Sequence, residues 1–331
     1  MADKIFKAND KEIKRIGILT SGGDAPGMNA AIRSIVRTCI STGIQPLGIK
    51  RGYNGLITND IVELNARSVN GITSRGGTML YTARCLEFKE PEGVKRAADN
   101  CKYLGIDGIV AIGGDGTFRG CRDLSNAGIN TVGIPGTIDN DIACTHYSIG
   151  FDTACNTAIE AIDKLSDTMQ SHERVSVVEV MGRNAGHLAI YVSISVGATA
   201  VLIPEKPSKI EEVTEKIREG RIHGKNHFII IVAEGVGNTT EIAQQIKDQT
   251  GMETRVTIIG HVQRGGSPSA RDRVMASRMG HYAVESLIKG KSNIVVCYRN
   301  SQICDLSIDD GLKMHKEIDP YMYEVSQDIS I

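Results

Sequence analysis

Apolar runs alternate with stretches of helical period along most of this chain. Short apolar runs rich in β-branched residues predict strands at 15–20, 108–112, 131–134, 175–180, 200–203, 227–232 and 255–259. Stretches of helical period predict helices at 28–42, 118–127, 152–170, 209–223, 239–251 and 269–289. Strands and helices that alternate in this way favour a parallel sheet covered on both faces. The predicted fold class is therefore α/β.

The length of the chain favours two lobes over one. A single hydrophobic core stops growing at about 250–300 residues, so 331 residues predict two lobes of roughly 150 each. We expect two doubly wound lobes with mostly parallel sheets, a substrate cleft between them, and a chain crossing near Pro135–Asp152. The region after Ile303 is charged and weakly patterned, which indicates a tail.

Composition and charge are those of an ordinary globular protein. Charged residues make up 23%, hydrophobic residues 41%, and the net charge is -1. This balance argues against a nucleic-acid or membrane-binding surface. Residues 1–15 lack a continuous apolar core, and the run Phe228–Ala233 is too short to span a bilayer. Eight cysteines without a C-x-x-C pair favour reduced thiols, so we expect a cytoplasmic protein.

Three turns that follow predicted strands carry the candidate chemistry: Ser21–Gly27, Gly113–Thr117 and Pro135–Asp141. Ligands of open parallel sheets bind at the carboxyl ends of the strands. Glycines let backbone N–H groups approach phosphate oxygens, and the carboxylates of Asp115, Asp139 and Asp141 suit a cation or a reacting hydroxyl. The pattern indicates a phosphate-handling site, with a plain strand-to-helix turn or an Asx-rich turn as the structural alternatives.

Arginines in or beside loops complete this pattern: Arg84, Arg174, Arg183, Arg255 and Arg264. Guanidinium groups bind phosphate oxygens through paired hydrogen bonds. His261 suits a sugar hydroxyl or phosphate, and Glu234 could accept hydrogen bonds from sugar hydroxyls. Each residue also has a structural interpretation, namely a surface salt bridge for an arginine, a structural role for the histidine and an ordinary strand-end carboxylate for Glu234.

Five blocks, in order and at family-like spacing, are similar to bacterial ATP-dependent 6-phosphofructokinases: Ser21–Asn29, Gly113–Thr117, Pro135–Asp141, Glu179–Arg183 and Gly260–Gly266. The similarity runs from about residue 15 to 300. It implies a glycolytic enzyme that transfers the γ-phosphoryl of ATP to the 1-hydroxyl of fructose 6-phosphate. It also implies a homotetramer, an ATP and Mg²⁺ lobe at 1–140 to which part of the C-terminal region returns, a sugar lobe at 141–300 and a tail at 301–331.

The resemblance also implies roles for individual residues. ATP would contact Gly23, Arg84, Cys85, Asp115, Gly116 and Thr117, with Asp115 on the magnesium, and Asp139 would be the catalytic base. The sugar phosphate would be bound or shaped by Thr137, Asp139, Asp141, Met181, Gly182, Arg183, Glu234, His261 and Arg264. Arg174 and Arg255 would reach the site of a neighbouring subunit.

Other positions concern the phosphoryl donor and regulation. Pyrophosphate-dependent relatives carry Asp and Lys where this chain has Gly116 and Gly136, so ATP is the expected donor. Arg33, Arg37 and Lys225 match positions that bind effectors in regulated members. At five other effector positions this chain departs from the residue that is usual in the family. It has Ala66, Arg67, Ser166, Thr199 and His223, where Arg, Tyr, Arg, Glu and Lys, respectively, are usual. We therefore expect regulation by ADP or phosphoenolpyruvate to be altered or absent.

The sequence disfavours two other functions and excludes one motif. Other kinases with a Gly-Gly-Asp-Gly turn, such as NAD or diacylglycerol kinases, match only near Gly113–Thr117 and leave Arg255–Gly266 unexplained. A nucleotide sensor without catalysis is disfavoured by the intact Asp115, Asp139 and Asp141. A P-loop is excluded, because Gly290–Ser292 is preceded by Glu285 where that motif requires glycine.

Overall fold

The computed structural model describes residues 13–330, which form two compact units by their contacts. The first unit comprises residues 13–137, 142–150 and 266–316, and the second comprises residues 138–141, 151–265 and 317–330. The chain passes between the units three times inside the segment Pro135–Asp152, where the sequence predicts a crossing. It passes again after Gly265 and after Lys316.

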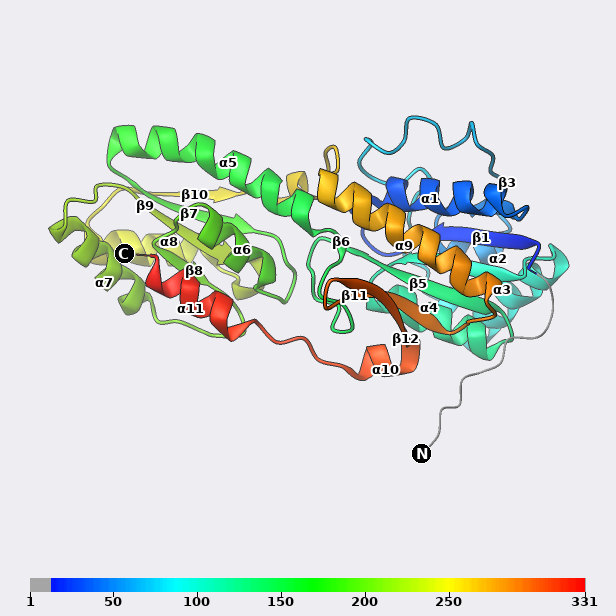
Figure 1. The fold of residues 1–331 in the computed structure, drawn as a ribbon. Helices are drawn as coiled ribbons and strands as arrows, with labels where there is room; N and C mark the ends of the chain where they lie inside the picture. The colour runs from blue at the N-terminus through cyan, green and yellow to red at the C-terminus, as the bar shows by residue number, and fades with distance from the viewer. Residues whose placement is uncertain (1–12, 331) are drawn as a thin grey trace. The chain divides into compact units, whose positions relative to one another are not determined.

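The first unit is built on a mixed sheet with a parallel centre (Figure 1). Its strands are β1 (Arg15–Thr20), β2 (Gln45–Ile49), β3 (Ile61–Glu63), β4 (Gly108–Gly113), β5 (Asn130–Thr137), β6 (Ile149–Gly150), β11 (Ile294–Arg299) and β12 (Gln302–Ser307). The order is β12-β11-β5-β4-β1-β2-β3, with β6 paired to β5. Within residues 13–330, only the edge strands β12 and β3 of this sheet pair antiparallel. The central strands β1 and β4 are apolar along nearly their whole length, as burial on both faces requires.

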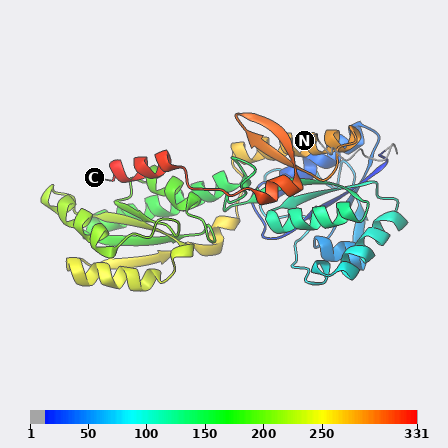
Figure 2. The ribbon, with the colours of Figure 1, turned by 90° about the horizontal axis from the view of Figure 1, so that it is seen from below.

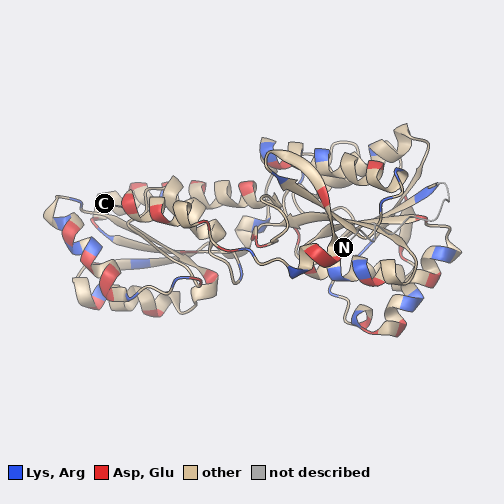
Figure 3. Cartoon of the chain, turned by 60° about the horizontal axis from the view of Figure 1, so that its bottom comes forward, with Lys and Arg blue, Asp and Glu red and all other residues tan. Residues whose placement is uncertain are grey.

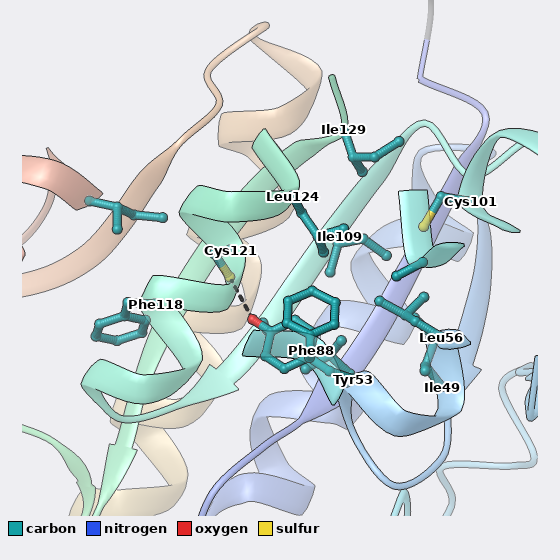
Figure 4. Close-up of a cluster of buried hydrophobic side chains, with 14 of the residues drawn as sticks. Ile49, Tyr53, Leu56, Phe88, Cys101, Ile109, Phe118, Cys121, Leu124 and Ile129 are labelled. Carbon is teal, nitrogen blue, oxygen red and sulfur yellow. Dashed lines mark hydrogen bonds between the residues drawn. The ribbon is translucent and has the colours of Figure 1, made fainter. Parts of the chain in front are cut away.

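Helices cover both faces of this sheet (Figures 1 and 2). On one face, α1 (Met28–Ser41) packs against α9 (Ala270–Ile288). The other face carries α2 (Tyr53–Thr58), η1 (Glu87–Lys89), α3 (Pro91–Tyr103), α4 (Asp115–Asn126) and α10 (Ile308–Lys313). Tyr53 and Phe88 stack in the core beneath α3 and α4, with ring centroids 4.2 Å apart (Figure 4).

The second unit has a smaller parallel sheet in the order β10-β7-β9-β8. Its strands are β7 (Val175–Val180), β8 (Ala200–Leu202), β9 (Phe228–Ala233) and β10 (Thr254–Ile258). Its helices are α5 (Phe151–His172), α6 (His187–Ser195), α7 (Ile210–Ile222), η2 (Glu234–Val236), α8 (Thr239–Thr250), η3 (Gly260–Arg264) and α11 (Pro320–Asp328). Helices α5 and α6 lie on one face of the sheet, and α7 and α8 on the other (Figure 2). The α/β fold class with mostly parallel sheets is thus confirmed.

The region after Ile303 is charged and weakly patterned in sequence, yet it forms regular secondary structure. It continues β12 to Ser307 and then forms α10 and α11. An edge strand and two short helices bury few side chains, which leaves a weak hydrophobic pattern. By their contacts, α9, β11 and β12 belong to the first unit, and α11 belongs to the second.

Acidic and basic side chains are interspersed along the helices of each unit (Figure 3). No helix within residues 13–330 is both long and apolar enough to cross a membrane. The expectation for residues 1–15 falls mostly on residues 1–12, which lie outside the described residues. All eight cysteines are free thiols. Burial raises the pKa of Cys39, Cys101 and Cys121 to about 12, so these thiols stay protonated and act as core residues.

Candidate active site

Three neighbouring strands of the first unit end at the same edge of the sheet. Strands β5, β4 and β1 are adjacent and parallel, with Gly113 opposite Pro135 and Ile112 opposite Thr20. The backbone N–H of Ser21 donates to the carbonyl of Ile112 over 3.0 Å. The turns that the sequence singles out therefore begin side by side, where ligands of open parallel sheets bind.

Gly113 lies at the closest contact between two of these turns. The hydroxyl of Thr117 donates to the carbonyl of Ser21 over 3.1 Å. A Cβ atom at Gly113 would lie 2.2 Å from Thr117 Oγ1 and 2.4 Å from the Ser21 carbonyl oxygen. Only glycine fits there, so Gly113 ties the first turn to the start of α4.

Helix α4 begins at Asp115 with its first backbone N–H groups at this edge. The amino end of a helix attracts anions through those N–H groups and the helix dipole. A Cβ at Gly114 or Gly116 would meet no atom within 4 Å. The start of α4 therefore has room for a phosphate group beside the Asp115 carboxylate.

The buried core below α4 fixes the position of its first turn. The Tyr53 hydroxyl donates to the Thr117 carbonyl over 2.5 Å and lies 3.4 Å from Cys121 Sγ (Figure 4). A Cβ at Gly120 would lie 2.5 Å from the Tyr53 ring, so the ring packs directly on the helix backbone. Burial, more than the nearby Cys121 and Asp123, raises the pKa of Tyr53 well above its usual value. Tyr53 therefore remains a hydrogen-bond donor to the helix.

The segment that contains Arg84 and Cys85 is fastened to the first turn, which contains Gly23. The Thr82 hydroxyl donates to the Gly22 carbonyl over 2.6 Å. The side chain of Asn29 accepts from Met79 N–H over 2.7 Å and donates to the carbonyls of residues 75 and 76. Cys85 is only partly buried and packs against the core of the first unit. The structure thus brings the expected ATP-contacting segments of this unit to one sheet edge.

Asp139 and Asp141 follow β5 and belong to the second unit by their contacts. Asp139 is 6% exposed, and Asn140 between the two acids has a positive φ of 49°. Asparagine tolerates this left-handed conformation better than most residues. Thr137, at the end of β5, belongs to the first unit.

In the second unit, most of the expected sugar-binding residues lie at the carboxyl end of the sheet. Met181, Gly182 and Arg183 follow β7, Glu234 follows β9, and His261 and Arg264 lie in η3 after β10. The Arg183 N–H donates to the Glu234 carboxylate, which joins two of these turns. Gly182 has a φ of 143°, and a Cβ there would lie 2.6 Å from the Ala185 carbonyl oxygen. This turn therefore requires glycine.

Gln263 is a buried residue to which the sequence reasoning assigned no role. Its side chain is fully buried, and its Oε1 accepts from the Met181 N–H over 2.8 Å. Among the described residues its Nε2 has no hydrogen-bond partner. The contact links η3 to the turn after β7, but it joins positions 82 residues apart, so no local sequence pattern marks it.

Arg174 and Arg255 lie at the opposite, amino end of the same sheet. Arg174 directly precedes β7, and Arg255 pairs with Ser176 near the start of that strand. Both bind one carboxylate: Arg174 Nε lies 2.7 Å from Glu253 Oε2, and an Arg255 guanidinium nitrogen lies 2.5 Å from Oε1. The hydrogen bond from Arg174 and the charges of both arginines lower the pKa of Glu253. Along β7, at about 3.3 Å per residue, this cluster is roughly 20 Å from Met181.

The expected effector residues are divided between the units. Arg33 and Arg37 lie on α1, where Arg37 donates to the Ala66 carbonyl over 3.1 Å. Lys225 follows α7 in the second unit, and burial lowers its pKa. Among the divergent positions, Thr199 is only 2% exposed, and the Ser166 hydroxyl donates to the Ile162 carbonyl within its own helix. Neither side chain carries a charge.

The chain belongs to the phosphofructokinase family, whose sequence model matches residues 15–287. The ATP-dependent 6-phosphofructokinase of Clostridium botulinum (strain Loch Maree) is 53% identical to it over 318 residues, which cover 96% of this chain and all of the relative. ATP-dependent 6-phosphofructokinase 1 of Clostridium perfringens is 52% identical with the same coverage.

Solved structures of phosphofructokinases share the fold. The phosphofructokinase of Saccharomyces cerevisiae gives a TM-score of 0.86 at 33% identity over 96% of this chain, which spans 48% of the yeast chain. A pyrophosphate-dependent phosphofructokinase from Marinobacter aquaeolei gives a TM-score of 0.83 at 19% identity. The match covers 96% of this chain and 92% of the Marinobacter chain. The second likeness supports the fold alone.

Proposed function

We propose that this chain is an ATP-dependent 6-phosphofructokinase that acts in glycolysis. It transfers the γ-phosphoryl of ATP to the 1-hydroxyl of fructose 6-phosphate, giving fructose 1,6-bisphosphate and ADP. The observation that carries the proposal is the convergence of three turns at one sheet edge, with Asp115 in the first turn of α4. Clostridial relatives that bear this name and match over their full length support it. We also propose that the protein is located in the cytoplasm.

We assign ATP to the sheet edge of the first unit, in contact with Gly23, Arg84, Cys85, Asp115, Gly116 and Thr117. Glycine turns and the α4 amino end would hold phosphate oxygens through backbone N–H groups. Open space around Gly116 supports a bulky nucleotide as donor in preference to pyrophosphate.

Magnesium would be held by Asp115 together with the nucleotide phosphates. Within residues 13–330, no group of three or more His, Cys, Asp or Glu side chains forms a metal cage. This fits Mg²⁺, which usually binds through one or two carboxylates, phosphate oxygens and water. When bound, the ion would neutralise charge on the transferred phosphoryl group.

Asp139 is assigned as the base toward the 1-hydroxyl of the sugar. Phosphoryl transfer has a loose transition state, so the main tasks of the protein are positioning and charge neutralisation. The Asp139 carboxylate would orient the acceptor hydroxyl and take its proton as the new bond forms. We place the sugar phosphate against Thr137, Asp141, Met181, Gly182, Arg183, Glu234, His261 and Arg264.

Arg174 and Arg255 are proposed to serve the sugar site of a neighbouring subunit in a homotetramer. They lie at the opposite sheet end from Met181 and Glu234. A separation of roughly 20 Å is too large for one hexose phosphate to contact both groups. A monomer would then hold an incomplete site.

Replacing Arg255 by alanine is expected to raise the KM for fructose 6-phosphate about tenfold or more, with a smaller effect on kcat. A hydrogen bond to a charged group contributes roughly 1.5–3 kcal/mol, and phosphate anchoring acts similarly on substrate and transition state. Arg218→Ala is the matched control, because Arg218 is also an exposed arginine paired with a glutamate in this unit. A lower kcat with an unchanged KM would contradict the assignment.

Regulation is expected to be weak or altered. ADP and phosphoenolpyruvate are titrated into the assay at a fructose 6-phosphate concentration below its KM. Because Thr199 and Ser166 lack the charges of regulated members, we expect little activation by ADP and little inhibition by phosphoenolpyruvate. Strong responses of the usual sign to both compounds would refute this expectation.

The donor is tested with purified protein, fructose 6-phosphate, Mg²⁺ and either ATP or pyrophosphate, with product formation coupled to aldolase. We expect turnover with ATP and none with pyrophosphate. Turnover with pyrophosphate alone would overturn the proposed donor. Mass measurement in the same buffer tests the tetramer.

A further inference from the structure

Asp272 is a fully buried carboxylate in the first turn of α9. Its own N–H donates to the hydroxyl of Ser269, the cap of that helix, over 3.2 Å. A buried carboxylate is stable only when hydrogen bonds replace its lost hydration. The hydrogen bonds of the Asp272 carboxylate therefore identify the segment that this residue holds in place.

The carboxylate of Asp272 binds the segment that follows the acidic turn. Its Oδ1 accepts from the Tyr147 hydroxyl over 2.5 Å and from the Gly150 N–H over 2.7 Å. The Tyr147 ring is 3% exposed, and the guanidinium of Arg271 lies 4.8 Å from its centre. Buried polar atoms are almost always hydrogen-bonded, and these two contacts satisfy this buried oxygen. Residues 147–150 are thus fixed to α9.

Strand β6 transmits this constraint to the end of β5. Gly150 pairs with Thr137 and Ile149 with Gly136. The Ser148 hydroxyl donates to the Thr137 carbonyl over 2.8 Å. Thr137 stands two positions before Asp139, so the backbone that leads into the proposed base is held by the segment that Asp272 binds.

The same segment packs against the first glycine turn. A Cβ at Gly150 would lie 2.6 Å from Ala25 Cβ, and a Cβ at Gly27 would lie 2.6 Å from Ile149 Cγ2 and 3.5 Å from Asp272 Cβ. Both glycines have a φ of 108°. With so little free space, residues 147–150 cannot shift without moving the turn at Ser21–Gly27.

We propose that Asp272, acting through Tyr147 and Gly150, is a positioning residue for phosphoryl transfer. It holds β6 against Gly136–Thr137 and thereby fixes the chain that carries Asp139. The inference rests on the proposed function and adds residues that make no direct contact with the reacting atoms.

Tyr147→Phe tests this proposal, with Tyr282→Phe as the matched control. Tyr282 also donates its hydroxyl to an aspartate, the half-buried Asp305, but it lies on α9 beside the edge strand β12. Each change removes one oxygen and one Tyr–Asp hydrogen bond. Misplacement of a reacting group lowers turnover steeply, so we expect Tyr147→Phe to reduce kcat by about ten- to a hundredfold. The KM for fructose 6-phosphate should stay within about twofold, and Tyr282→Phe should retain wild-type kcat.

Hydrogen–deuterium exchange of peptides covering 134–151 gives a readout that does not depend on activity. Faster exchange there in Tyr147→Phe, and not in Tyr282→Phe, supports the proposal. Wild-type kcat in Tyr147→Phe overturns it, and so do equal losses of kcat in both variants. Asp272→Asn is the second variant, and if it does not fold, Tyr147→Phe decides alone. A wild-type protein without turnover on ATP and fructose 6-phosphate refutes the proposed function itself, before any variants are compared.

Discussion

Asp139→Asn is expected to lower kcat by about 10²- to 10⁴-fold, the usual contribution of a general base. Asparagine keeps the shape of the side chain but does not accept the proton of the sugar hydroxyl. Because Asp139 is 6% exposed, little water can reach its carboxylate to take over this role. The KM for fructose 6-phosphate is expected to change only a few-fold, since a base acts mainly in the transition state. A coupled steady-state assay measures both parameters.

Asp163→Asn is the control for this substitution. Asp163 lies on α5 in the same unit, and its side chain is exposed, so its loss removes the same charge without touching the turn. We expect wild-type kcat in the control. If Asp139→Asn also retains wild-type kcat, Asp139 is not the base.

Gly113→Ala is expected to lower both stability and activity strongly. The added methyl group would lie 2.2 Å from Thr117 Oγ1 and 2.4 Å from the Ser21 carbonyl oxygen, so either the hydrogen bond between them or the backbone must give way. Overpacking of this kind costs typically 1–3 kcal/mol, which lowers Tm by several degrees at roughly 2–4 °C per kcal/mol. Thermal unfolding measures the loss, and the KM for ATP should rise because the phosphate turn is distorted.

Gly114→Ala is the matched control for stability. It adds the same methyl group one position along, where no atom lies within 4 Å and the backbone has a φ of -99°. Any L-residue adopts that conformation without strain. We expect an unchanged Tm in Gly114→Ala. Equal losses of Tm in both variants would show that the close contact at Gly113 is not the cause.

The strong hydrophobic patterns predicted the central elements of the fold. The bounds of β1 and β7 agree with the structure, because both are apolar strands with clear turn signals at their ends. Among the described strands and α-helices, ten were missed: β2, β3, β6, β11, β12, α2, α3, α6, α10 and α11. The short ones among them, such as β3 and α2 with three and six residues, carry too little periodicity to be recognised. Because β2 and β11 are interior strands, the α/β class was visible in the sequence but the full strand order of the first sheet was not.

The turns of the candidate site could be predicted, whereas their supports could not. Glycines and acids directly after apolar strands mark Ser21–Gly27, Gly113–Thr117 and Pro135–Asp141 in the sequence. The contacts Gln263–Met181 and Asp272–Tyr147 join residues 82 and 125 positions apart. Such contacts arise from packing between elements, which no local pattern encodes.

The most direct test of the central claim is ³¹P NMR of a mixture of the purified protein, Mg-ATP and fructose 6-phosphate. The account predicts that the γ-phosphate signal of ATP disappears while ADP and a second sugar phosphomonoester, at carbon 1, appear in equal amounts. Release of inorganic phosphate with fructose 6-phosphate unchanged, or no loss of ATP, would contradict it.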